Sequence, residues 1–340
     1  MATWVGLDVG GANLKIASQS MSKIWPFPLW KAPEKLASEL SDKLKRFEPF
    51  ENIAVTMTGE LADCFESRQA GVEFICEAVE KISKGRPLRF YQTNGNFVSV
   101  QQAIKSWRLT AASNWHASAA LIGRTLKDCI VVDIGSTTTD IIPIRNGVPV
   151  SIGKTDFERL ANGELLYTGV SRTSIATVLR TATLKRQRVN LAAEYFASMH
   201  DAYIVLGKMP EAPDDRNTAD GRPADRNSAV RRLAKLLCLD ESELDQDELR
   251  DFAMQIYRRH MELIAEEIEV VSSRTGSLPF VVLGEGEWLG REAIGSIQPK
   301  SQILNRTQTS AIFSGDLNLA VGPAYAVCEL ASSLAVSKIH

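Results

Sequence analysis

Apolar and polar positions along this chain follow two patterns, one typical of buried strands and the other typical of helices. The strand-type runs are short, apolar and bounded by small or polar residues, and they occupy residues 5–9, 52–57, 131–134 and 279–283. The helix-type stretches are amphipathic or rich in small residues, and they occupy residues 112–124, 240–271 and 317–335. This alternation predicts an α/β protein.

Two of the strand-type runs open segments that match one another. Placing VGLDVGGANLKIA (residues 5–17) over IVVDIGSTTTDII (residues 130–142) aligns Asp8 with Asp133 and Gly10 with Gly135 at one constant offset. Apolar residues flank a small-residue break in both copies, so each is predicted to fold as strand, tight turn and strand. A Rossmann loop would instead lead from its glycines into a helix.

Each predicted hairpin carries the residue types that bind phosphate and a divalent cation. Glycine at the turn lets a ligand approach bare backbone amides. The aspartate just before the turn is a suitable oxygen ligand for a hydrated divalent cation. An alternative is that both are ordinary hairpins with aspartate in its common turn role. The repetition favours a paired ligand site.

Composition narrows the classes of function. The chain has 340 residues, enough for two domains, and a net charge of −2 that gives no electrostatic case for nucleic acid or a membrane surface. Its five cysteines are scattered without a CxxC pair, which argues against a disulfide framework and a zinc site. No apolar run approaches the roughly 20 residues that cross a bilayer, and the first residues lack a signal-peptide pattern. We therefore expect a soluble cytoplasmic protein.

Several loops at predicted strand ends carry further polar residues. Thr58 and Glu60 follow the strand at 52–57, with a helix expected to begin near Glu60. Ligands of open α/β sheets gather beyond the carboxyl ends of strands, so these residues are candidates for the site. The alternative is that Glu60 occupies the favourable first turn of a helix.

Two arginine-bearing loops are candidates for binding an anion. Arg172 lies in a loop ahead of a helical stretch, where arginine and a helix N-terminus together attract anions, although a plain loop is equally compatible. Residues 214–226 interleave arginines, Arg222 among them, with aspartates before a helix from about Asn227. This segment is either a flexible exposed loop or a lid that closes on a magnesium–diphosphate group.

The paired motifs resemble a known superfamily. GLDVGGANLK and VVDIGSTTTD resemble the two phosphate motifs of the acetate and sugar kinase, Hsp70 and actin superfamily. PFVVLGEGEWL resembles its nucleoside-binding segment, except that Glu285 separates Gly284 from Gly286, which leaves ATP binding open. The resemblance implies two ribonuclease-H-like domains with an interdomain cleft. We expect residues 1–125, completed by a C-terminal helix at 320–340, and residues 126–319, with a helical and loop insertion around 185–275.

A narrower resemblance rests on several motifs together. TMTGELADCF, SNW, VDIGSTTTDIIP, LLYTGVSRT and TADGRP resemble the hydantoinase/oxoprolinase-related proteins of the tetrahydromethanopterin-linked C1 transfer pathway. Archaeal members make the furan–tyramine ether core of methanofuran. The resemblance implies a transferase that condenses an aminomethylfuran-methyl diphosphate with a tyramine-type phenol and releases pyrophosphate, in the synthesis of methanofuran or methylofuran.

The resemblance and this chemistry together assign roles to residues. Asp8 and Asp133 are expected to bind Mg²⁺, Asp140 to contact the metal or orient the furan amine, and Glu60 to accept the phenol proton. Residues expected to bind the diphosphate or another part of the substrate are Gly10, Gly11, Asn13, Lys15, Thr58, Gly135, Ser136, Thr137, Thr138, Arg172, Arg222, Gly284 and Gly286.

Three other functions stay open at this stage. The same fold serves ATP-dependent small-molecule kinases, and an intact glycine pair at 284–286 would favour one. A hydantoin- or oxoproline-opening enzyme is disfavoured by the short chain and by the lack of a histidine cluster. A nucleotide-binding sensor would also need a ligand site, so polar residues in the loops at strand ends do not exclude one. No heptad or exposed apolar stripe is evident in the sequence, so the oligomeric state, a homo-oligomer included, stays open.

Overall fold

The computed structural model describes residues 3–336, and its contacts divide the chain into two compact units. Unit 1 takes the chain as far as Val131, then Ile142–Asn162, and the part from Leu304 onward. Unit 2 comprises Val132–Ile141 and Gly163–Ile303. The assignment of residues 1–125 and 126–319 to two actin-like domains stays a prediction.

Unit 1 is built on a six-stranded mixed sheet of order β3-β2-β1-β4-β5-β6. Its strands are β1 (Trp4–Val9), β2 (Asn13–Ala17), β3 (Ser22–Pro26), β4 (Asn52–Met57), β5 (Leu88–Tyr91) and β6 (Phe97–Val98). The first three strands pair antiparallel, and β4 then pairs parallel with β1 and with β5. Every residue of β4 is buried, as expected of a central strand covered on both faces.

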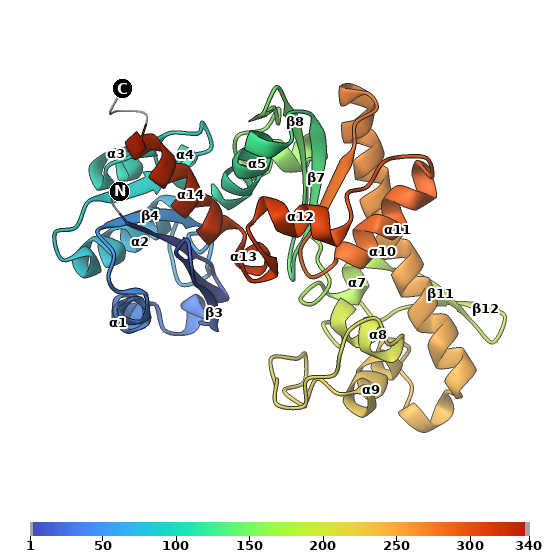
Figure 1. Ribbon diagram of the computed structural model, residues 1–340. Helices are drawn as coiled ribbons and strands as arrows, with labels where there is room; N and C mark the ends of the chain where they lie inside the picture. The colour runs from blue at the N-terminus through green and yellow to red at the C-terminus, as the bar shows by residue number, and fades with distance from the viewer. Residues whose placement is uncertain (1–2, 337–340) are drawn as a thin grey trace. The chain divides into compact units, whose positions relative to one another are not determined.

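Unit 1 also contains α-helices. They are α1 (Leu36–Leu44), α2 (Arg68–Ser83), α3 (Val100–Lys105), α4 (Trp107–Thr110), α5 (Asn114–Thr125), α6 (Asp156–Ala161), α12 (Arg306–Ile312), α13 (Asp316–Val321) and α14 (Pro323–Val336). In Figure 1 α14 lies along the sheet, and it contacts β1 so closely that a Cβ on Gly6 would stand 1.9 Å from the Ala324 carbonyl oxygen. The expected closing helix is in fact two helices, because Gly322 and Pro323 interrupt it.

The second sheet has the order β10-β8-β7-β13, with β9 against β8. Its strands are β7 (Cys129–Ile134), β8 (Thr139–Arg145), β9 (Val148–Pro149), β10 (Leu165–Leu166) and β13 (Phe280–Leu283). The boundary between the units falls within β7 and β8. The hairpins β1–β2 and β7–β8 confirm the two strand–turn–strand predictions, and the sheets with their helices confirm the α/β class.

The rest of unit 2 is mainly helical. Its elements are α7 (Ile175–Val178), the hairpin β11 (Thr181–Leu184) and β12 (Gln187–Asn190), α8 (Met199–Val205), α9 (Arg226–Leu236), α10 (Gln246–Thr275) and α11 (Glu287–Ile297). A capping box between Asp245 and Glu248 starts the long α10, which packs against α8 and α11 (Figure 1). The helix predicted within residues 240–271 is confirmed by α10, and the strand predicted at 279–283 is confirmed by β13.

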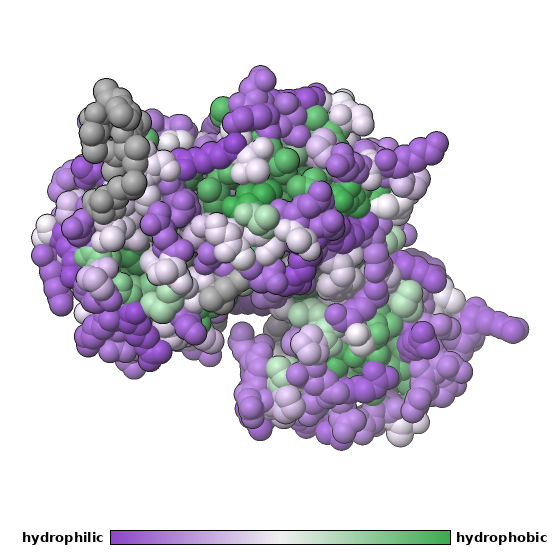
Figure 2. Space-filling view, in the orientation of Figure 1, coloured by the Kyte–Doolittle hydropathy of each residue, from purple (hydrophilic) through white to green (hydrophobic). Residues whose placement is uncertain are grey.

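One expectation from the sequence is wrong. The helix expected near Glu60 begins at Arg68, because the Ser67 hydroxyl caps it by accepting from the Ala70 N–H. Hydrophilic residues cover much of the face in Figure 2, with apolar residues among them. Several of the large exposed apolar side chains lie within residues 148–160 of unit 1: Val148, Val150, Ile152, Phe157 and Leu160.

No helix among residues 3–336 combines the length and the apolar character needed to cross a membrane.

Candidate active site

The first predicted hairpin places Asp8 opposite Lys15. The two residues are partners in the β1–β2 register, and Asp8 Oδ2 lies 3.3 Å from Lys15 Nζ. Asp8 Oδ1 is buried and has no hydrogen-bond partner within the described chain. Burial raises the pKa of Asp8, and the ammonium of Lys15 opposes this. The carboxylate therefore has one oxygen held by Lys15 and one oxygen available to a ligand.

The turn after Asp8 is tight and leaves room for a ligand. The Gly10 N–H donates to the Asn13 carbonyl at 3.0 Å, which closes the turn. A Cβ added at Gly11 would meet no heavy atom within 4 Å. The backbone at this turn is therefore accessible, as binding of a phosphate to backbone amides requires.

The carboxyl end of β4 lies directly beside this hairpin. The N–H groups of Thr58 and Gly59 both donate to the Val9 carbonyl, at 3.0 and 2.9 Å. Within β4, the Thr56 hydroxyl is hydrogen-bonded at 2.8 Å to the hydroxyl of Ser113, the residue directly before α5. Thr58 and the Asp8 hairpin thus lie in one part of unit 1, and Glu60 follows Thr58 by two residues.

Glu60 is a buried carboxyl group with one oxygen unsatisfied. Its exposure is 1%, Oε1 lies 3.5 Å from Arg68 Nη2, and Oε2 has no hydrogen-bond partner among the described residues. Burial raises the pKa of Glu60 to about 7, against the opposing charge of Arg68. A carboxyl group with a pKa near neutrality is suited to general acid–base chemistry.

The second predicted hairpin, in unit 2, carries a loop bound to its turn. The Gly135 N–H donates to the Thr138 carbonyl at 2.9 Å and closes the turn. The Val170 N–H then donates to the Gly135 carbonyl at 3.0 Å, and the Arg172 N–H to the Ser136 carbonyl at 2.8 Å. A Cβ at Gly169 would stand 2.4 Å from the Gly135 oxygen, so the loop and the turn are in close contact. The helix expected after this loop is the single turn α7, so backbone hydrogen bonds, and not a helix N-terminus, place Arg172 here.

The glycines of the third motif also lie against this hairpin. Gly284 has φ of +86°, and a Cβ there would stand 2.6 Å from Asp133 Oδ1. The Gly286 N–H donates to the Ile134 carbonyl at 2.9 Å. Glu285 between them accepts a hydrogen bond from the Ser171 hydroxyl at 3.3 Å. Unit 2 thus brings the hairpin, the Arg172 loop and residues 284–286 together.

Two other predicted site residues differ in their surroundings. Asp140 lies in β8 of the second hairpin, where it pairs with Leu165 in the β8–β10 ladder. The side chain of Arg222 is 52% exposed, and its Nε lies 3.9 Å from Asp220 in its own loop. Arg222 makes no contact with the second hairpin among the hydrogen bonds and ion pairs of the described chain.

The polar loop that contains Arg222 is held by an arginine that the sequence did not single out. Arg232 of α9 is fully buried and pairs with Asp201 at 2.6 Å and with Asp220 at 3.0 Å. The Ala212 and Ala224 backbones form a bridge at the base of the loop. These contacts connect the loop at residues 212–224 to α8 and α9.

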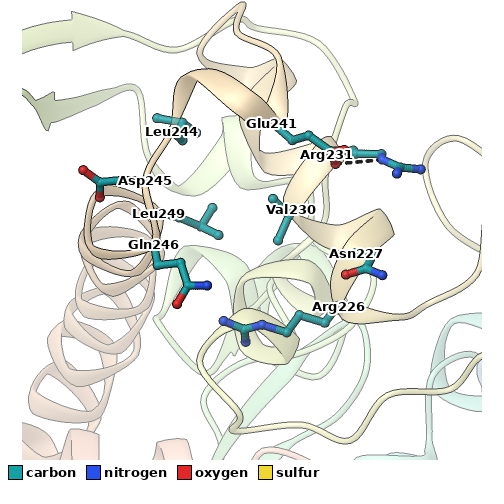
Figure 3. Close-up of a pocket in the computed structure, with 9 residues that line it drawn as sticks. All are labelled: Arg226, Asn227, Val230, Arg231, Glu241, Leu244, Asp245, Gln246 and Leu249. Atoms are coloured by element: carbon teal, nitrogen blue, oxygen red, sulfur yellow. Dashed lines mark hydrogen bonds and ion pairs between the residues drawn. The ribbon is translucent and has the colours of Figure 1, made fainter.

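A surface pocket of about 440 Å³ lies between α9 and α10 of unit 2 (Figure 3). Val230, Leu244 and Leu249 give it an apolar side, and the Arg231–Glu241 ion pair, 2.7 Å long, lies at its margin. None of the predicted site residues lines this pocket. Within residues 3–336 no group of three or more histidine, cysteine or acidic side chains is placed to bind a metal.

Comparisons with known proteins relate most of the chain to one family. The hydantoinase/oxoprolinase family model matches residues 51–286. A protein of Methanocaldococcus jannaschii named (4-{4-[2-(gamma-L-glutamylamino)ethyl]phenoxymethyl}furan-2-yl)methanamine synthase is 36% identical over 333 residues, which are 96% of each chain. A Methanococcus vannielii protein of the same name is 36% identical over 214 residues, 63% of this chain and 95% of that one.

Solved structures also match, at low sequence identity. A ROK family glucokinase from Streptomyces griseus is 13% identical, with 95% of this chain and 98% of that chain covered and a TM-score of 0.47. A ROK hexokinase from Thermus thermophilus is 14% identical, with 99% of each chain covered and a TM-score of 0.45.

Proposed function

The chain belongs to the hydantoinase/oxoprolinase family, and from this premise we propose that it is a synthase of the furan–phenol ether in methanofuran-type cofactors. The observation that carries the proposal is the relationship with the Methanocaldococcus synthase across nearly the full length of both proteins. The name of that protein describes a phenoxymethylfuran, in which an ether oxygen joins a phenol ring to a furan methylene.

The proposed reaction is a transfer of the EC 2.5.1 type. The substrates are an aminomethylfuran that carries a methyl diphosphate and a tyramine-type phenol. The bond between the furan methylene carbon and the diphosphate oxygen breaks, and pyrophosphate leaves with the electron pair. The phenol oxygen forms the new bond to that carbon, and its proton passes to Glu60.

Each hairpin, taken by itself, carries residues suited to bind phosphate oxygens. In unit 1 the Gly10 N–H closes the turn, the open position at Gly11 offers a backbone amide, and Lys15 offers a positive charge. In unit 2 Ser136, Thr137 and Thr138 offer amides and hydroxyls beside Arg172, whose backbone is hydrogen-bonded to the same turn. Donors placed before the reaction stabilise the charge that develops on the leaving group.

Asp8 meets the requirements of a ligand for Mg²⁺. Its Oδ1 is buried and lacks a hydrogen-bond partner in the described residues, and magnesium prefers carboxylate oxygens. We propose that Asp133, its counterpart in the second hairpin, is also a ligand. When bound, the cation supplies positive charge to the diphosphate.

Glu60 is the proposed base. Its Oε2 lacks a hydrogen-bond partner among the described residues and is available for the phenol proton. A carboxyl group with pKa about 7 is a stronger base than an exposed glutamate with pKa 4.5, and about half of it is ionised at neutral pH.

The test uses purified protein with the furan diphosphate, tyramine or γ-glutamyltyramine, and Mg²⁺. Pyrophosphate release and the mass of the ether product are measured, and ADP formation from ATP is assayed in parallel. We expect an ether and pyrophosphate without ATP. ADP formation with no pyrophosphate from the furan diphosphate would overturn the proposal and indicate a kinase.

Separate Asp8→Asn and Asp133→Asn variants test the site. Both are expected to fold, as judged by circular dichroism, and to lose pyrophosphate release. Asp42→Asn is the matched control, because Asp42 is exposed and pairs only weakly with Lys45 at 3.3 Å. Full activity in both hairpin variants would refute the metal assignment.

A further inference from the structure

The position of Glu60 is fixed by the start of α2. Arg68 is the first residue of that helix, and Gly71, one turn later, lies against the backbone of Glu60. A Cβ on Gly71 would stand 2.3 Å from the Glu60 carbonyl oxygen. The helix therefore carries both a close backbone contact with Glu60 and the cation nearest to its carboxyl group.

Two acidic side chains compete for this one cation. Arg68 Nη2 lies 3.5 Å from Glu60 Oε1 and 3.2 Å from Asp156 Oδ2. Asp156 is held in place because it opens α6, whose start is fixed by a capping box between Thr155 and Glu158. Glu60, Arg68 and Asp156 all belong to unit 1.

We propose that Arg68 is a positioning residue for Glu60 and that Asp156 tunes its effect. Arg68 holds Glu60 by Oε1, which directs Oε2 to the proton that it accepts. The carboxylate of Asp156 partly offsets the positive charge of Arg68. Glu60 is therefore a stronger base than it would be if Arg68 paired with Glu60 alone. The identity of that proton as the phenol's rests on the proposed function.

The charges that act on Glu60 come from two elements. Arg68 of α2 favours the ionised form, and Asp156 of α6 favours the protonated form. The two neighbours therefore act in opposite directions on one carboxyl group. A purely structural ion pair predicts no such opposition in the pH dependence of the reaction.

The first experiment measures kcat/KM for pyrophosphate release as a function of pH. The acid limb of this profile is the range in which kcat/KM falls because Glu60 becomes protonated. In Arg68→Gln this limb is expected to move to higher pH by about one unit or more, because an adjacent opposite charge shifts a carboxyl pKa by about that amount. In Asp156→Asn the limb is expected to move downward. Arg68→Lys keeps a positive charge and is expected to retain most of the wild-type profile.

The matched control is Arg86→Gln, which removes another arginine–glutamate pair of unit 1, Arg86 with Glu48 at 2.7 Å, and is expected to leave the limb unchanged. Limbs that do not move, or that move in the same direction in Arg68→Gln and Asp156→Asn, would overturn the inference. If Arg68→Gln does not fold, the downward shift in Asp156→Asn decides, because loss of an ion pair alone gives no such shift.

A second experiment does not depend on the substrate. Glutamate labelled with ¹³C at the carboxyl carbon allows Glu60 to be titrated by NMR, with Glu60→Gln to assign its signal. The same opposite shifts are expected in the two variants. Opposite NMR shifts without turnover of the furan diphosphate would count against the proposed function and leave the positioning role intact, whereas unshifted NMR titrations would overturn the positioning role whatever the substrate.

Discussion

Replacing Glu60 by glutamine is expected to remove a loss of stability that unit 1 undergoes as the pH rises toward neutrality. The pKa of Glu60 is 4.5 in an unfolded chain and about 7 in the folded protein, because burial disfavours its ionised form. A carboxyl whose pKa is raised on folding contributes stability below its unfolded pKa, and this contribution disappears as the pH rises through the folded pKa. The relevant window therefore runs from pH 4.5 to about 7.

The size of the effect follows from the shift. A change from 4.5 to about 7, at about 1.36 kcal/mol per pKa unit, corresponds to roughly 3 kcal/mol of unfolding free energy lost across that window. Glutamine carries no such charge, so its variant does not lose this stability. The variant also loses the contact between Glu60 and Arg68, which changes its free energy of unfolding by a separate amount. The prediction therefore concerns only how the difference in unfolding free energy between wild type and variant changes across the window.

The assay is hydrogen exchange of the β4 amides in wild type and Glu60→Gln, at a series of pH values from 4.5 to 8. Amides of this buried strand report on the opening of unit 1, which avoids assigning one unfolding transition to a protein of two compact units. The stability difference is expected to move in favour of glutamine by roughly 3 kcal/mol across the window. A difference that stays constant over this range would refute the reasoning, because Glu60 would then titrate as an exposed carboxyl.

Two further predictions concern unit 2. Gly169→Ala should lower the free energy of unfolding of unit 2 by about 1–3 kcal/mol and raise KM for the diphosphate substrate, because its Cβ would stand 2.4 Å from the backbone at Gly135 and Thr137. Unchanged urea unfolding and KM would contradict this close contact. Arg232→Met should cost about 3–5 kcal/mol, since it leaves the buried Asp201 without its cation. Thermal unfolding measures this cost, and limited proteolysis reports on the 212–224 loop. If the loop of the variant resists the protease as well as that of the wild type, Arg232 does not hold the loop.

The twin hairpins could be predicted from the sequence because their determinants are local. Each consists of an apolar run, a small-residue turn and a second apolar run, and the constant offset between the copies needs no knowledge of tertiary contacts. The same is true of the strand before Gly284 and of the capped start of α10. The proximity of the Arg172 loop and Gly284 to the second hairpin is instead a tertiary fact, and the sequence supported it only by resemblance.

The pairs that control buried charge were not predictable, because their partners are far apart in the chain. Arg68 and Asp156 are separated by 88 residues, and neither stands in a motif that identifies it. Arg232 pairs with Asp201, which lies 31 residues earlier in the chain, and the sequence did not single it out. Their burial depends on which elements pack together, and spacing along the chain does not contain that information.

The raised pKa of Glu60 also fits the proposed chemistry. A phenol has a pKa of about 10, so proton transfer to a carboxylate of pKa 4.5 would be uphill by about 5.5 units, against about 3 units for a carboxylate of pKa about 7. Burial thus removes roughly 3 kcal/mol from the cost of moving the proton, by the same physical term that destabilises the folded protein. The remaining gap leaves little phenolate in equilibrium with Glu60 before the reaction begins. In the proposed reaction it therefore favours proton transfer in step with formation of the carbon–oxygen bond, which acidifies the phenol as pyrophosphate leaves.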